Sequence, residues 1–150
     1  MVTTDLVSVV VPCFNAASFV EEAVSSVLAQ SHQDLEIIAV DDGSTDDSLA
    51  HLQGAAASEP RLRVFTQSNG GPAAARNTGL RHARGNFFCF LDADDTFLPH
   101  KLSSQLAALR LHPSASLVYS DYFIADSRLV PTGFVPTCIP ADDTVPAFAR

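Results

Sequence analysis

The chain has 150 residues, of which 47% are hydrophobic and 17% are charged, and its formal net charge is −8. This length and composition favour one globular domain with a buried core over a disordered chain. The acidic balance and the presence of a single lysine, Lys101, argue against nucleic-acid binding through a basic surface.

The sequence shows no sign of membrane insertion or secretion. No apolar run approaches the roughly 20 residues of a membrane-spanning helix, and the N-terminus lacks the basic start and apolar core of a signal peptide. The three cysteines, Cys13, Cys89 and Cys138, match neither a disulfide framework nor a zinc pattern. We therefore expect a cytoplasmic protein with reduced thiols; the alternative is a longer form that is associated with a membrane.

The first half of the chain alternates between apolar strands and amphipathic helices. A capping box at Ser18 and Glu21 predicts the first helix start, and Ser44 or Thr45 is expected to cap the second helix. The predicted elements are a strand at Leu6–Val11, a helix ending near Gln30, a strand at Leu35–Val40, a helix to about Ala57, and a more exposed strand at Arg61–Thr66.

The second half begins with a helix predicted at Pro72–Ala83, with Gly71 in the N-cap position. Five successive apolar residues at Phe87–Leu91 predict a strand that is buried on both faces. The remaining predictions are a helix from Pro99 with Leu102, Leu106 and Leu109 on one face, and a fifth strand at Ser116–Ser120 that Asp121–Ala125 continues or bends away from. From Pro131 onward the pattern predicts no element.

Four alternations of strand and helix predict an α/β fold with parallel strands and helices on both faces of the sheet. Ligands of such sheets bind beyond the C-terminal ends of the strands. In this chain those ends carry Pro12–Asn15, Asp41–Ser44, the loop at 67–77 and the acidic segment Asp92–Asp95. The polar segments therefore converge on one edge.

The acidic segment has three carboxylates in four positions, and they repel one another unless a cation is bound. Alternate residues of an extended segment point the same way, so Asp92 and Asp94 are expected to converge on one divalent ion. The alternative is a solvated acidic turn at a helix start.

The other loops at this edge suit a nucleotide. A carboxylate of Asp41 or Asp42 can accept a hydrogen bond from a base or a ribose, although a helix cap is the alternative. The helix start after Gly71 favours phosphate, and Arg76 is placed either to contact a phosphate or to pair with an aspartate. Phe14 either stacks on a base or packs in the core.

Four segments, VSVVVPCFN, EIIAVDDGSTDDS, NGGPAAARNTGL and GNFFCFLDADDTFLP, occur in an order and spacing that resembles family 2 glycosyltransferases. The resemblance covers about residues 6 to 125. It implies a GT-A fold, a Rossmann-like three-layer α/β/α sandwich with a mostly parallel central sheet. It also implies that residues 1–150 form a single nucleotide-sugar-binding domain.

The resemblance implies a metal-dependent site for a nucleotide-diphosphate sugar, with a UDP-sugar favoured. Asp92 and Asp94 match the family's DxD motif, and Asp94 is the expected direct ligand of Mg²⁺ or Mn²⁺. Phe14 departs from the tyrosine that is common in the family, and so loses a hydroxyl but keeps a stacking face. The donor-binding residues implied are Pro12, Phe14, Asn15, Asp41, Asp42, Gly71, Arg76, Asp92, Ala93 and Asp94.

Family members invert the anomeric configuration, with a downstream Asp or Glu taking the proton of an acceptor hydroxyl. The acceptor is a carbohydrate, lipid or protein. Asp121, Asp126, Asp142 and Asp143 do not match that position, so the catalytic base is expected beyond Arg150. The resemblance thus implies a domain truncated on its acceptor side, which binds donor and transfers sugar poorly.

Two other functions remain open at this point. One is a nucleotide-sugar-binding module without catalysis. The other is a phosphatase resembling the haloacid dehalogenase family, in which Asp92 of FCFLDADDTF is the nucleophile and Asp94 the acid. That family carries its motif on the opening strand, whereas three strands precede it here, and no lysine follows except Lys101.

Overall fold

The computed structural model describes residues 5–136. The chain divides into two compact units, with the boundary between Ser103 and Ser104.

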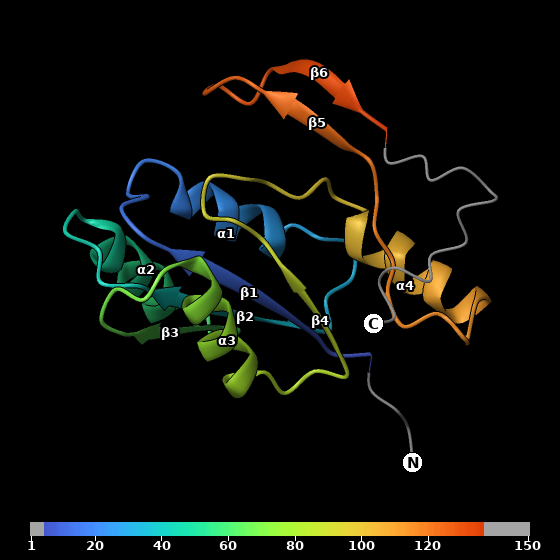
Figure 1. The fold of residues 1–150 in the computed structure, drawn as a ribbon, viewed down its shortest axis with the longest axis horizontal. Coiled ribbons are helices and arrows are strands. Elements are labelled where there is room, and N and C mark those ends of the chain that lie inside the picture. The colour runs from blue at the N-terminus through green and yellow to red at the C-terminus, as the bar shows by residue number, and fades with distance from the viewer. Residues whose placement is uncertain (1–4, 137–150) are drawn as a thin grey trace. The chain divides into compact units, whose positions relative to one another are not determined.

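The first unit is built on a four-stranded parallel sheet in the order β3-β2-β1-β4 (Figure 1). The strands are β1 (Val7–Cys13), β2 (Leu35–Asp41), β3 (Leu62–Thr66) and β4 (Phe87–Phe90). Each consecutive pair is joined by a helical crossover, as parallel pairing requires. The predicted α/β class with a parallel sheet is confirmed.

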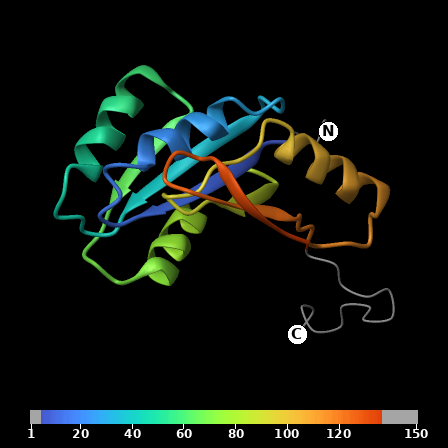
Figure 2. The same cartoon turned by 90° about the horizontal axis from the view of Figure 1, so that it is seen from above.

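Helices cover both faces of this sheet. Figure 2 shows α1 (Val20–Leu28) and α2 (Ser48–Ser58) on one face and α3 (Pro72–His82) on the other. The helix α3 packs against β1 and β2, where Gly79 permits close approach: a Cβ built on Gly79 lies 2.3 Å from Val10 Cγ1. A side chain at position 79 would therefore push helix and strand apart.

The two central strands form the core of the unit. Every residue of β1 and β2 is buried, and their valines and isoleucines are β-branched residues that suit a strand covered on both faces. The buried polar residues of these strands are Ser8, Glu36 and Asp41, and Glu36 accepts hydrogen bonds from Ser8 Oγ at 2.7 Å and from the Arg84 backbone N–H at 2.6 Å. This network fixes the connection between α3 and β4.

The strand register brings the predicted loops to one edge. Cys13, Asp41 and Thr66 are paired across β1, β2 and β3, so these three strands end at the same level. The fourth strand joins them, since the Leu91 N–H donates to the Val10 carbonyl at 3.0 Å just before the acidic segment. The convergence predicted from the sequence is confirmed.

Two predicted helix caps are wrong, because other groups make the contacts at these helix starts. The helix α1 begins at Val20, and its N-cap, Phe19, makes no side-chain cap bond; Ala16 O instead accepts the N–H groups of Phe19 and Val20. The helix α2 begins at Ser48, because Ser44 and Thr45 bond to Asn15.

The strand β4 is not buried on both faces as its apolar sequence predicts. It is an edge strand of the described sheet, and its exposure alternates, with Phe88 58% exposed and Phe90 39% exposed. The helix α3 packs mainly on β1 and β2, so the rings of Phe88 and Phe90 contact each other edge to face, and the Arg76 guanidinium lies 5.7 Å from the Phe90 ring.

The helix α4 (Lys101–Leu111) follows close to the predicted position. In the second unit the predicted strand at Ser116–Ser120 is absent, and β5 (Tyr122–Ala125) pairs antiparallel with β6 (Pro131–Val135). The turn between them is stabilised by Asp126 Oδ1, which accepts the N–H groups of Arg128 and Val130.

The strand β6 was missed because its proline and glycine indicate a loop, whereas local turn bonding makes a hairpin there. Cys138, Asp142 and Asp143 lie outside the described residues. Within 5–136, no helix has both the length and the apolar character needed to cross a membrane.

Candidate functional site

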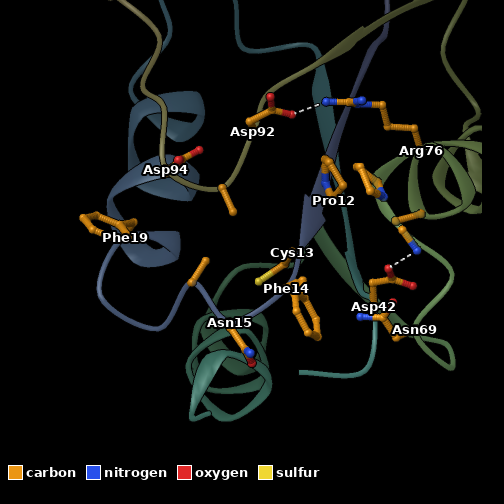
Figure 3. Close-up of a pocket in the computed structure, with 15 residues that line it drawn as sticks. Pro12, Cys13, Phe14, Asn15, Phe19, Asp42, Asn69, Arg76, Asp92 and Asp94 are labelled. Carbon is orange, nitrogen blue, oxygen red and sulfur yellow. Dashed lines mark hydrogen bonds and ion pairs between the residues drawn. The ribbon is translucent and has the colours of Figure 1, made fainter. Parts of the chain in front are cut away.

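A cavity of about 530 Å³ opens at the C-terminal ends of β1, β2 and β4 (Figure 3). Nine of the ten predicted donor-binding residues line it; the exception is Asp41. In Figure 3, Arg76, Asp92 and Asp94 lie toward one end of the cavity, and Phe14, Asp42 and Asn69 toward the other. One end of the cavity thus has a guanidinium and two carboxylates. The other end has an aromatic ring, an amide and a carboxylate.

The loop after β1 is locked to the loop after β2. Asn15 has a positive φ of 51°, and its Oδ1 accepts the Thr45 N–H at 2.8 Å while its own N–H donates to Ser44 Oγ at 3.0 Å. Asparagine tolerates this left-handed backbone better than most residues. The locked loop presents Phe14 at the cavity with 49% of its surface exposed, so the ring is available to stack rather than packed in a core.

Asp42 anchors the loop that carries the amides of the cavity wall. Its Oδ1 accepts hydrogen bonds from Gln67 Nε2 at 2.7 Å and Gly70 N at 2.9 Å, and its Oδ2 accepts from Gly71 N at 2.7 Å. Burial alone would raise the pKa of Asp42, but these three hydrogen bonds outweigh burial and lower the pKa below its usual value. Asp42 is therefore ionised and holds the start of α3 in place.

Asp41 differs from its neighbour. It is 3% exposed and does not line the cavity; its Oδ2 accepts the Ser44 N–H at 3.3 Å, and its Oδ1 is buried with no hydrogen-bond partner among the described residues. Its observed role is to shape the turn at Gly43, whose φ of +74° suits glycine.

Arg76 projects from α3 to the far end of the cavity and pairs with Asp92, with 2.5 Å between Arg76 Nη2 and Asp92 Oδ1. The ring of Phe90 lies 5.7 Å from the Arg76 Cζ, within the range of a cation–π contact. Of the two sequence interpretations of Arg76, the structure therefore shows the aspartate pair.

The acidic segment is a turn rather than an extended strand end. The Asp95 N–H donates to the Asp92 carbonyl at 3.0 Å, so the alternation that predicted parallel Asp92 and Asp94 side chains does not apply. Partial burial and the nearby charges of Asp94 and Asp92 raise the pKa of Asp95.

These residues suit a divalent cation that is shared with a phosphate ligand. Within residues 5–136, no group of three or more His, Cys, Asp or Glu side chains is arranged to hold a metal by itself. Mg²⁺ is usually held by one or two carboxylates together with substrate phosphates, at hard oxygen ligands. Asp92 and Asp94 provide that number of carboxylates on the cavity wall.

Six residues that line the cavity are not among the ten predicted donor-binding residues: Cys13, Ala16, Phe19, Asn69, Pro72 and Ala75. Asn69 belongs to the loop that the sequence analysis placed at this edge, so a residue-by-residue reading of that loop would have included it. Phe19 carried no such signal, because an aromatic residue at a helix start is usually assigned to the core.

The family model for glycosyl transferase family 2 matches residues 8–131. An uncharacterized glycosyltransferase of Rickettsia felis is 45% identical over 100 residues, which are 67% of this chain and 16% of that protein. The phosphatase interpretation of the acidic segment is thereby replaced, since the match extends over the whole alternating region.

Two solved structures with bound donors are similar to this chain. TarS 1-349 of S. aureus in complex with UDP-GlcNAc has a TM-score of 0.65 and 26% identity, covering 79% of this chain and 40% of that one. The mannosyltransferase PcManGT from Pyrobaculum calidifontis, in complex with GDP-Man and Mn²⁺, has a TM-score of 0.63 and 29% identity, covering 81% and 36%. The chain therefore spans less than half the length of each of these three proteins.

Proposed function

The chain belongs to glycosyl transferase family 2 and has the GT-A type of fold, and from this premise we propose that it binds the nucleotide-diphosphate sugar donor of an inverting, metal-dependent glycosyl transfer. The observation that carries the proposal is the cavity, which joins an aromatic and amide end to an end with Arg76 and two carboxylates. These two ends correspond to the two chemically different parts of such a donor.

The nucleoside occupies the end with Phe14, Asp42 and Asn69. Phe14 offers a stacking face, and the Asn69 side chain has both a donor and an acceptor for the edge of a base. We favour UDP as the nucleotide, which is the nucleotide of the TarS complex; the PcManGT complex contains GDP-Man.

The diphosphate extends from the start of α3, where Gly71 is the N-cap and helix N-termini favour anions, to the end of the cavity with Arg76, Asp92 and Asp94. Asp94 and Asp92 are the proposed ligands of Mg²⁺ or Mn²⁺. When bound, the cation neutralises charge that develops on the departing diphosphate.

In the proposed reaction an acceptor hydroxyl oxygen attacks the anomeric carbon, and the bond from that carbon to the diphosphate oxygen breaks. The leaving group keeps the electron pair as a nucleoside diphosphate, and the hydroxyl proton passes to a general base. In the described part, the carboxylates lining the cavity are Asp42, Asp92 and Asp94, and all three have donor-binding roles. We propose that the base and the acceptor site come from sequence outside this chain, because the relatives are longer.

The first prediction is that UDP raises the melting temperature of the chain when Mn²⁺ is present. A ligand at 100 times its dissociation constant stabilises the native state by about 2.7 kcal/mol. Asp94→Ala should abolish the metal-dependent part of this gain in a thermal-shift assay. Asp34→Ala is the matched control, because Asp34 is an exposed carboxylate just before β2, at the other end of the strand from the cavity.

The proposal fails if UDP, GDP and dTDP all leave the melting temperature unchanged with Mn²⁺ present. The alternative of a binding module without catalysis is tested by a chain extended to the length of its relatives. Acceptor-dependent release of UDP by that protein supports transfer, and tight donor binding without release over an acceptor panel supports the binding module.

A further inference from the structure

The carboxylates after β4 are unequally partnered. Asp92 is held by Arg76, whereas Asp94 is exposed and has no side-chain hydrogen bond or ion pair within the part of the chain that the structure describes. The two carboxylates assigned to the cation are therefore not equally available. One is free to bind at once, and the other already has a positively charged partner.

The partner of Asp92 is not rigidly buried. The Arg76 side chain is 33% exposed and that of Asp92 49% exposed, so water reaches both groups. Ion pairs of this exposure contribute at most a few-fold to an equilibrium, and so this pair can open. Phe90 provides the guanidinium with a second contact, at 5.7 Å from its Cζ, that does not depend on Asp92.

We propose that Arg76 is a positioning residue that exchanges partners during donor binding. Before the donor arrives, Arg76 neutralises and orients Asp92. When the cation and the diphosphate bind, Arg76 releases Asp92, which then binds the cation. The Arg76 guanidinium moves across the face of the Phe90 ring and contacts the diphosphate. This inference rests on the proposed donor site, and it adds that Arg76 and the cation compete for Asp92 within that site.

Two physical reasons favour the exchange. A guanidinium and a divalent cation on the same carboxylate repel each other, so the pair opposes cation binding as long as it is closed. A diphosphate is the better final partner, because the guanidinium fork matches phosphate geometry and carries more opposite charge there.

The exchange makes cation and nucleotide binding cooperative. A cation that binds alone bears the cost of opening the Arg76–Asp92 pair, and no anion replaces the lost contact. With a diphosphate present, the freed guanidinium gains a phosphate partner. Arg76 thus lowers the affinity for the cation alone and raises the affinity for the two ligands together, which is a coupling between two sites.

The test is a calorimetric titration of Mn²⁺ alone and of UDP in saturating Mn²⁺, for the parent chain, R76Q and R81Q. R76Q should bind Mn²⁺ alone about two- to fivefold more tightly and bind UDP in Mn²⁺ about tenfold or more weakly. R81Q should resemble the parent in both titrations, since it removes the same charge from an exposed residue of α3 that donates to Thr78 Oγ1.

A double-mutant cycle with D92N gives an independent readout. D92N frees Arg76 without a metal, so UDP in the presence of EDTA should bind D92N several-fold more tightly than the parent chain. The gain should disappear in the R76Q/D92N double variant. If the gain instead persists in that double variant, it comes from the lost negative charge and the partner exchange is wrong.

Equal or weaker Mn²⁺ binding by R76Q overturns the inference while leaving the donor site intact, provided that D94A abolishes Mn²⁺ binding in the same assay. If the parent chain binds neither Mn²⁺ nor UDP, the proposed function itself fails, and the inference with it. The two failures are therefore distinguishable.

Discussion

Asp41 and Asp42 are adjacent and chemically identical, yet the structure gives them different environments. Asp42 lies on the cavity wall and accepts three hydrogen bonds from Gln67, Gly70 and Gly71. Asp41 does not line the cavity, and one of its buried oxygens has no hydrogen-bond partner among the described residues. The difference follows from the alternation of side chains at the end of β2, which sends neighbouring residues to opposite faces.

At the residue scale we expect Asp42→Asn to lower both stability and nucleotide affinity. The new amide group would face N–H donors, and losing a hydrogen bond to a charged group typically costs about 1.5–3 kcal/mol. Urea denaturation measures the first effect, and titration with UDP in Mn²⁺ measures the second. Asp41→Asn is the matched comparison and should lower stability and nucleotide affinity by less. Unchanged UDP affinity in Asp42→Asn would limit Asp42 to anchoring the loop.

The two described cysteines carry a second prediction at this scale. Burial raises the pKa of Cys13 and raises the pKa of Cys89 to about 11. Because the thiolate is the reactive form, both should react slowly with iodoacetamide at pH 8 in the folded chain and rapidly in urea. Peptide mapping by mass spectrometry measures each rate, and rapid labelling of the half-buried Cys89 in the folded chain would contradict its raised pKa.

At the scale of the elements, the position of α3 depends on a contact without a side chain. Gly79 faces Val10 so closely that a Cβ would lie 2.3 Å from Val10 Cγ1. The start of α3 is fixed separately, through the bonds from Gly70 and Gly71 to Asp42. Close packing along the helix and anchoring at its start together set where Arg76 emerges.

Gly79→Ala should therefore destabilise the chain, by about 1–3 kcal/mol in the range typical of overpacked cores. Gly54→Ala on α2 is the control, because no atom lies within 4 Å of a Cβ built there. That substitution should be neutral or stabilising by up to about 1 kcal/mol, as alanine favours helix. Urea denaturation of the two variants should give shifts of opposite sign, and adding Val10→Ala should restore part of the loss in Gly79→Ala.

At the scale of the whole molecule, stability depends on carboxylates whose pKa is lowered by folding. Although burial opposes ionisation of Glu36, hydrogen bonds from Ser8, Arg84 and Arg63 hold its pKa below the usual value. Arg61 lowers the pKa of Glu59 to about 2. A group whose pKa is lower in the folded state adds stability above its unfolded pKa, and this stability is lost as the pH falls through the folded pKa.

We therefore expect the free energy of unfolding to decrease as the pH falls from about 5 toward 2. Glu36→Gln should reduce stability at pH 7 and flatten this acid dependence, because the charged partner of Arg63 is removed. Glu22→Gln, at an exposed position of α1, should have the same dependence of unfolding free energy on pH as the parent chain. If the free energy of unfolding falls equally with pH in Glu36→Gln and in the parent chain, Glu36 does not contribute to acid unfolding.

Local sequence determined most of the first unit. Alternating β-branched runs and helical patterns placed β1, β2, β3 and α3 within one or two residues, since strands and helices buried in this way need continuous or periodic apolar residues. The same reasoning placed the four polar loops at one edge, because parallel strands joined by right-handed crossovers must end together. Nine of the ten predicted donor-binding residues consequently line one cavity.

Tertiary contacts decided what the local pattern does not contain. Ser44 and Thr45 are good helix caps, but Asn15 engages them across 29 and 30 residues, so α2 starts later. The partner of Asp92 is Arg76, 16 residues away, and that choice depends on how closely α3 packs against β1. The exposure of β4 and the pairing of β5 with β6 likewise depend on which elements are neighbours. Local propensity fixes the elements, whereas the partners of their polar groups are fixed only when packing and register bring distant segments together.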